Sequence, residues 1–172
     1  MRLFSKRGFS FGRGSLLIKK WGRKTKMSME NRFFEILMYR VQIEENLKGK
    51  EHKRLNEATI KMQVRRSDGQ LVFVHKVADG EGVGPVDALD KVLRKALIDF
   101  YPQVANVRLM DYEVHKKNGD IGTESLVEVI ITSTDGQNQW RTSGVSVNVI
   151  KASLLALAKS LEEEISRLLV TV

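Results

Sequence analysis

Residues 78–100 read ADGEGVGPVDALDKVLRKALIDF, and this stretch carries the signals of a turn that leads into a helix. Pro85 suits the first helical position, because its missing N–H group would have no partner there. Asp87 in the first turn and Arg94 further along have the charges that suit the helix dipole. The spacing of the apolar residues predicts a helix with one buried face. That face comprises Leu89, Val92, Leu93, Ala96, Leu97 and Phe100.

The glycines before this helix have two interpretations. Free N–H groups at a helix start that follows a glycine turn can bind an anion such as a carboxylate. The glycines can also serve only to turn the chain from a strand into a helix. The pattern alone favours this structural interpretation, because isolated glycine motifs often occur without a ligand.

The chain before the turn predicts three strands. In residues 33–43, Leu37, Tyr39, Val41 and Ile43 alternate with more polar residues, which indicates a half-buried strand. Residues 44–56 are polar and predict a loop. Residues 57–66 and 71–77 predict two further strands, joined by a hairpin turn at Asp68-Gly69.

The same order then begins again. Residues 107–114, 125–132 and 140–147 predict strands, and a second Asp-Gly turn lies at Asp135, 67 residues after Asp68. Asn148 is a suitable N-cap for a second helix. Its apolar stripe, with apolar residues on the flank as well, predicts burial on more than one side. The stripe comprises Ile150, Leu154, Leu157, Ala158, Leu161, Ile165 and Leu168, and the flank Ala152, Leu155 and Ala156.

The predicted fold is therefore α+β, with two βββα modules over residues 33–104 and 105–170. Each module is an antiparallel three-stranded sheet with its helix packed on one face. Such a unit buries little surface alone, so we expect the two modules to pack together. The wide apolar surface of the second helix predicts a homodimer.

The net charge of +8 is concentrated in one segment. Residues 1–28 contain nine Lys or Arg and no acid, whereas the remainder holds 20 basic against 21 acidic residues. We expect residues 1–28 to be a disordered basic tail and residues 29–172 to be the folded domain. A transit peptide, an RNA-binding arm, a start at Met27 or Met29, and the remnant of a longer gene are the alternatives for the tail.

Composition excludes several classes of protein. The nearly neutral body argues against nucleic acid as a partner. The absence of cysteine excludes a disulfide scaffold, a Cys-ligated zinc and a thiol nucleophile. No apolar run approaches the roughly 18 residues of a membrane span. We expect a cytoplasmic protein, with targeting to an organelle through the basic segment as the alternative.

The titratable residues predict no active site. His52, His75 and His115 have no partner at metal-ligand spacing, and Asp111 with His115 forms no recognisable catalytic pair. There is no Gly-x-Ser-x-Gly motif. The glycines of residues 80–84 are not followed by the Lys-Ser/Thr of a phosphate-binding loop. We therefore expect no catalytic residue, no metal and no cofactor.

Residues 34–169 resemble the C-terminal regulatory, or LeuA dimerisation, domain of the 2-isopropylmalate synthase and citramalate synthase family. The stretches that carry the resemblance are EATIKMQV, GPVDALDKVLRKALIDFYP, VRLMDYEV, STDG and W-x-T-x-GVSVNVIKAS from Trp140 to Ser153. The FYP ending and the STDG…W pair are closer to the citramalate synthase branch. The resemblance implies two βββα modules that dimerise and bind the end product, isoleucine or leucine.

The family's separate (β/α)₈ catalytic barrel is absent from these 172 residues. The resemblance therefore implies a sensor and dimerisation module that inhibits a synthase and is not itself an enzyme. A structural dimerisation subunit without a ligand, a subunit or fragment of a split synthase, and a nucleic-acid-binding protein that uses the basic tail remain as alternatives.

The resemblance and the physics of helix starts together predict where an amino acid binds. The glycine approaches and helix starts suit its carboxylate. Asp87 or Asp111 suits its ammonium group, and the small Ala88 and Ala152 leave room for a branched side chain. The predicted effector-binding residues are Gly82, Gly84, Pro85, Asp87, Ala88, Asp111, Gly144, Ser146, Asn148 and Ala152.

The first glycine turn departs from the family pattern, which usually reads Asp/Glu-Gly-Asn-Gly-Pro-Val. Residues 79–86 read DGEGVGPV, two residues longer and with the acidic Glu81. A longer acidic turn can repel an effector carboxylate, so this departure predicts altered or lost binding as the alternative to normal binding.

Overall fold

The computed structural model describes residues 33–45, 54–79, 84–117 and 125–170. The predicted tail, residues 1–28, and Gly82 of the predicted site lie outside these ranges. The elements are, in order, β1 (Phe34–Glu45), β2 (Arg54–Arg65), β3 (Leu71–Asp79), α1 (Pro85–Leu97), the 3₁₀ helix η2 (Pro102–Asn106), β4 (Arg108–Lys116), β5 (Val127–Thr134), β6 (Gln139–Ser146) and α2 (Val149–Val170). This order confirms the two predicted βββα modules.

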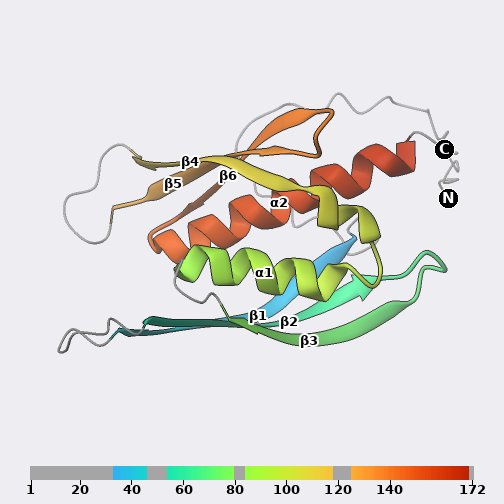
Figure 1. The fold of residues 1–172 in the computed structure, drawn as a ribbon, viewed down its shortest axis with the longest axis horizontal. Helices are drawn as coiled ribbons and strands as arrows, with labels where there is room; N and C mark the ends of the chain where they lie inside the picture. Colours follow the sequence, from blue (N-terminus) through green and yellow to red (C-terminus); the bar gives the residue numbers. More distant parts are fainter. Residues whose placement is uncertain (1–32, 46–53, 80–83, 118–124, 171–172) are drawn as a thin grey trace, which may run out of the picture.

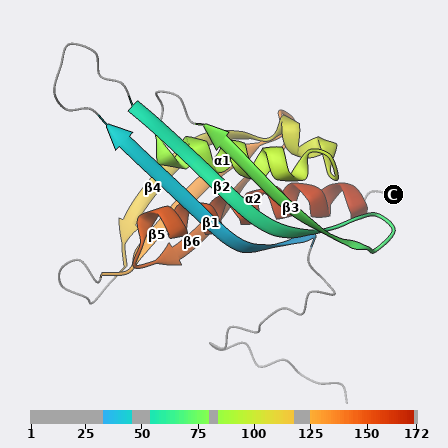
Figure 2. The ribbon, with the colours of Figure 1, turned by 90° about the horizontal axis from the view of Figure 1, so that it is seen from below.

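The two modules form three layers. Strands β1-β2-β3 and β4-β5-β6 make two antiparallel sheets, each with its strands in sequence order. Helices α1 and α2 contact each other and lie between the two sheets (Figures 1 and 2). Helix α1 packs on β2 and β3, and α2 packs on β5 and β6. Both helices begin at the same end of the molecule, so their positive dipole ends lie at that end (Figure 1).

The buried face of α1 is the one that its sequence predicts. Leu89, Val92, Leu93, Ala96 and Leu97 are completely buried, and the central strand β2 supplies the facing apolar side chains. Helix α2 is buried on more than one side because it lies between the second sheet and α1. Its buried residues include Ala152, Leu154, Ala156, Leu157, Ala158, Leu161 and Ile165.

Both predicted Asp-Gly hairpin turns are confirmed. Gly69 and Gly136 have φ values of 84° and 96°, which glycine adopts without strain. The side chain of Asp68 accepts a hydrogen bond from the Gln70 N–H group, and Asp135 accepts one from Gln137. Hydrogen bonds from Asn138 and Gln137 lower the pKa of Asp135 to about 2.

The predicted alternation of β1 is wrong at two positions. Leu37 and Ile43 are 49% and 58% exposed. The register shifts between Ile36 and Met38, so Leu37 is the extra residue of a β-bulge, and Ile36 and Tyr39 are the ones that pack against the core. Ile43 lies near the end of β1, which runs to Glu45, and this end of the strand extends beyond the helices (Figure 1).

Strand β4 repeats this bulge. Its register shifts between Leu109 and Asp111, which makes Met110 the extra residue. In each module the bulge lies two residues before a tyrosine, Tyr39 in β1 and Tyr112 in β4. Each tyrosine packs against the core, so the bulge is a shared feature of the duplicated fold.

The connections also differ from the prediction. The expected loop at residues 44–56 is shorter, because β1 runs to Glu45 and β2 begins at Arg54. After α1, the helix η2 leads into β4. Tyr101 before η2 donates a hydrogen bond to the Arg65 carbonyl oxygen, and burial raises the pKa of this tyrosine. Within the described ranges, no helix is both long and apolar enough to cross a membrane.

Candidate functional site

The start of α1 is built as a site where a ligand can approach the backbone. Gly84 is the N-cap residue and has φ 141°, a conformation that favours glycine, and Pro85 occupies the first turn as predicted. No side chain of the described residues caps this helix. The Ala88 N–H group donates to the Gly84 carbonyl oxygen at 3.1 Å. The N–H groups of Val86 and Asp87 precede that of Ala88 in the first turn, and they have no acceptor within the helix.

A pocket of about 370 Å³ lies at this helix start. Its volume is within the range of about 300–1,000 Å³ that is typical of small-molecule sites. One wall comes from the first module and the other from strand β4 of the second module. The pocket therefore lies between the modules. Its lining residues are Gly84, Pro85, Val86, Asp87 and Asp90 on α1, and Leu109 and Tyr112 on β4.

Two carboxylates lie on the α1 wall, and each is paired with a cation. Asp87 lies 2.8 Å from the Lys91 ammonium group, and Asp90 Oδ2 accepts a hydrogen bond of 2.7 Å from Arg94 Nε. The second oxygen of Asp90 is buried and accepts no hydrogen bond. Carboxylates beside free helix N–H groups suit a ligand that carries a cation and an anion close together.

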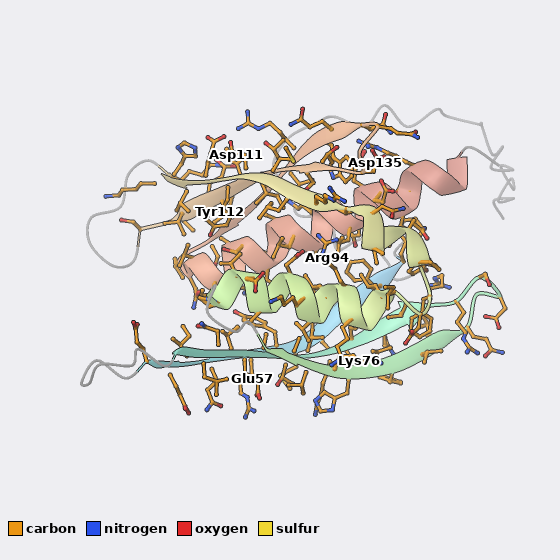
Figure 3. All side chains as sticks on the ribbon, in the orientation of Figure 1. Glu57, Lys76, Arg94, Asp111, Tyr112 and Asp135 are labelled. Carbon is orange, nitrogen blue, oxygen red and sulfur yellow. The ribbon has the colours of Figure 1, made fainter. Side chains whose placement is uncertain are left out.

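Tyr112 joins the β4 wall to the second helix. Its hydroxyl lies 2.8 Å from Ser153 Oγ on α2. Figure 3 shows Tyr112 on the side of β4 that faces the helices. The pocket is thus bounded by the start of α1 and by a strand that is fixed to α2.

The predicted residues at the start of α2 cap the helix or allow it to pack closely on β6. Asn148 is the N-cap, as predicted: its Oδ1 accepts from Lys151 N–H and its carbonyl oxygen from Ala152 N–H. The Ser146 hydroxyl oxygen accepts a hydrogen bond from Asn148 N–H. A Cβ atom at Gly144 would lie 2.1 Å from the Ala152 carbonyl oxygen, so Gly144 allows β6 to approach α2 closely.

The structure does not bring all the predicted residues together. Gly84, Pro85 and Asp87 line one pocket, but Ala88 and Ala152 are completely buried and line none of its surface. Asp111 lies on the opposite side of β4 from Tyr112, on the outer face of the second sheet (Figure 3). It lines a separate pocket there.

The outer pocket is lined mostly by polar and charged side chains, among them Glu113 and Arg141. Glu113 Oε2 lies 2.8 Å from His115 Nε2, and Glu113 Oε1 accepts from Arg141 at 2.6 Å. The hydrogen bond with His115 and the Arg141 charge lower the pKa of Glu113. Within the described residues, no group of three or more acidic or histidine side chains could hold a metal ion.

Four lining residues of the pocket were not among the predicted site residues: Val86, Asp90, Leu109 and Tyr112. The sequence pattern could have predicted Asp90 as a lining residue, because it lies three positions after Asp87 on the same helix face. The pattern could not have predicted Leu109 and Tyr112, because the face of β4 on which their side chains lie depends on the bulge at Met110.

Comparison with known proteins identifies the family. Residues 19–165 match the model of the LeuA allosteric (dimerisation) domain. The chain is 39% identical over 144 residues, 84% of its length, to the (R)-citramalate synthase of Geobacter sulfurreducens, and covers 26% of that protein. It is 42% identical to the Aquifex aeolicus (R)-citramalate synthase over 62% of the chain and 19% of that protein. It is 46% identical to the Sulfolobus acidocaldarius (R)-citramalate synthase over 64% of the chain and 20% of that protein.

These similarities confirm the resemblance that the sequence motifs carry. The chain spans about a quarter or less of the length of these relatives. The family match covers both modules, including the start of α1 and the walls of the pocket. The chain belongs to the LeuA allosteric (dimerisation) domain family.

Proposed function

We propose that this chain is an effector-binding regulatory module that binds isoleucine, or alternatively leucine, in the pocket between α1 and β4. Binding there inhibits a citramalate or 2-isopropylmalate synthase by feedback. The observation that carries the proposal is the combination of free helix N–H groups, carboxylates and apolar side chains around one pocket.

Each part of a free amino acid has a matching group in this pocket. The carboxylate binds the N–H groups of Val86 and Asp87. The ammonium group binds the carboxylates of Asp87 and Asp90. The branched side chain packs on Leu109. Selection between isoleucine and leucine then depends on methyl placement, which is worth only about 1–3 kcal/mol.

The position of the pocket supports a regulatory role. A ligand that contacts α1 and β4 at once favours one arrangement of the two modules over others. The catalytic residues of the synthase lie in a part that these 172 residues do not include, so the module acts on a catalytic barrel in the same or another chain.

Isothermal titration with isoleucine, leucine and valine tests the binding proposal. We expect isoleucine to bind most tightly. Asp87→Asn should weaken binding, whereas Asp111→Asn removes the same charge on the outer face and should leave affinity unchanged. A folded sample that gives no heat with any of the three amino acids would contradict the proposal.

We also propose that the chain forms a homodimer. The dimerisation function in the family description supports this. Exposed apolar side chains on β4 and around α2 supply a surface that a second copy can cover. They are Met110, Val114, Val147, Val149 and Leu155.

Mass measurement by light scattering tests the dimer. Leu155→Glu on α2 should reduce the mass toward that of one chain. Phe73→Ser is the matched control, because Phe73 is 73% exposed on β3, away from this surface. A wild-type chain that is monomeric at high concentration would refute the dimer.

The long acidic glycine turn favours a second candidate function. A longer turn that contains the acidic Glu81 can repel an effector carboxylate, and the module would then serve only for dimerisation, or as a subunit of a split synthase. A neighbouring gene that encodes a barrel alone supports the split enzyme. Replacing residues 79–84 by the family's shorter turn should then create effector binding that the wild type lacks.

A further inference from the structure

One side chain, Arg94, connects the two walls of the pocket. We propose that Arg94 is a positioning residue that sets the distance between α1 and β4, and so determines which branched side chain the pocket selects. This inference rests on the proposed amino-acid binding for its effect on selectivity, but its structural part can be tested without any ligand.

The guanidinium group of Arg94 makes three hydrogen bonds. Nε donates to Asp90 Oδ2 at 2.7 Å, within α1. Nη1 donates to the carbonyl oxygens of Val104 at 2.7 Å and Val107 at 2.5 Å. The Arg94 and Asp90 side chains are only 20% and 21% exposed, so water weakens these bonds little.

The acceptors lie at the point where the chain enters β4. Val104 belongs to η2, and Val107 directly precedes the strand. Both valine side chains are buried, so this segment is packed as well as hydrogen-bonded. Leu109, which lines the pocket, follows Val107 by two residues. Figure 3 shows Arg94 on the side of α1 that faces the second module.

The β4 wall is therefore fixed at two points. Arg94 holds the entry of the strand to α1, and the contact between Tyr112 and Ser153 holds it to α2. Asp90 lines the pocket and also orients Arg94. A change at Arg94 consequently moves a pocket wall although Arg94 does not line the pocket.

Arginine suits this role better than lysine. Its planar fork presents several N–H groups in a fixed geometry, so one side chain can bond two carbonyl oxygens and a carboxylate together. A lysine ammonium group can keep the charge next to Asp90 but lacks this geometry. Arg94→Lys should therefore retain the ion pair and lose most of the positioning.

The test combines hydrogen exchange with titration. In Arg94→Met, exchange of the amides in residues 104–112 should accelerate about tenfold, because the strand entry loses its anchor. The preference for isoleucine over valine, one methylene apart, should fall by about tenfold. Arg94→Lys should change both in the same direction. Lys95→Met is the matched control, because the Lys95 ammonium group donates to the Val77 carbonyl oxygen in the first module. This control should change neither the exchange rates nor the preference for isoleucine.

A double-mutant cycle separates positioning from general destabilisation. Leu109→Ala should weaken isoleucine binding in the wild type but add little in Arg94→Met, because the wall is already displaced. Additive losses, or a preserved preference for isoleucine, would overturn the inference. If Arg94→Met does not fold, the same two measurements on Arg94→Lys, hydrogen exchange and the preference for isoleucine, test the inference.

Failure of the amino-acid-binding proposal can be distinguished from failure of the inference about Arg94. A wild type that binds none of the amino acids refutes the binding proposal, and the selectivity part of this inference with it. Hydrogen exchange in residues 104–112 then still tests whether Arg94 holds the entry of β4 to α1. Unchanged exchange in Arg94→Lys and Arg94→Met would refute it.

Discussion

The hydroxyl groups of Tyr112 on β4 and Ser153 on α2 lie 2.8 Å apart. Ser153 Oγ donates its own proton to the Val149 carbonyl oxygen at 2.7 Å, so Tyr112 is the donor in the contact between the hydroxyls. The bond links an edge strand to the first turns of the second helix. It fixes the β4 wall of the pocket to α2.

Tyr112→Phe should lower the free energy of unfolding by about 0.5–1.5 kcal/mol, the usual contribution of one such hydrogen bond. It should also weaken effector binding, because the ring remains but loses its fixed position. Chemical denaturation and titration measure the two effects. Ser153→Ala removes the same bond, so the double variant should be little less stable than Ser153→Ala alone. Fully additive losses would show that the two hydroxyls act independently.

Gly144→Ala should destabilise the second module by about 3 kcal/mol, the upper end of typical overpacking costs. The added Cβ would lie 2.1 Å from the Ala152 carbonyl oxygen and 2.8 Å from the Ala156 nitrogen, and neither backbone atom can move without displacing α2. Thermal denaturation measures the loss. Gly136→Ala is the control, because no atom lies within 4 Å of its Cβ position and only its φ of 96° opposes alanine. Equal losses in both variants would contradict a steric role for Gly144.

Gly84→Ala and Gly84→Asp form a matched pair at the α1 start. Both are strained, because φ 141° with ψ 175° is a region for glycine and costs other residues about 1–3 kcal/mol. Only the Asp variant adds negative charge beside the proposed carboxylate site. We expect isoleucine affinity to be roughly tenfold to a hundredfold lower in Gly84→Asp than in Gly84→Ala. Equal affinities would remove this helix start from the site.

Glu164→Gln should raise the thermal midpoint at neutral pH. Burial, and then the Asp135 charge, raise the pKa of Glu164, whose side chain is almost fully buried on α2. The folded state therefore binds a proton more tightly than the unfolded chain, and stability falls as pH rises from the ordinary glutamate value through the raised one. The variant should have no advantage below about pH 4, where both states are protonated. Glu163→Gln, at a more exposed carboxylate, is the comparison variant and should not raise the thermal midpoint. A pH-independent gain in Glu164→Gln would refute the titration.

Local sequence patterns were sufficient for the elements and their order. The stripe from Leu89 to Leu97, the two Asp-Gly turns and the Asn148 cap each depend on interactions within a few residues. Such features are visible in a single sequence, because the chain positions that interact are close together.

The path of the buried face in β1 and β4 was not predictable in the same way. Leu37 and Met110 are apolar and fit a regular alternation, and only pairing with β2 and β5 makes them extra residues. The second wall of the pocket depends on this pairing, so the sequence did not show that Tyr112 faces the pocket while Asp111 lies on the opposite face of β4.

The roles of the small residues also depend on tertiary packing. In sequence, Gly144 looks like a glycine approach for a ligand carboxylate and Ala152 like room for a ligand side chain, but both lie at the close contact between β6 and α2. Whether a small residue opens a cavity or allows two backbones to meet depends on what lies opposite. One sequence does not contain that information.

The bulges at Leu37 and Met110 make these two positions tolerant to deletion. Removing one residue from a regular strand turns every side chain on one side of the gap to the opposite face of the sheet. Leu37 has no partner on β2, so a chain without it would keep Ile36 and Tyr39 paired and facing the core as before. The same holds for Met110 and Tyr112 in β4. Loss of Ile60 from the central strand would instead expose the core side of β2. The duplicated fold therefore contains, on one edge strand of each sheet, one residue that evolution can discard without changing which side of the strand faces inward.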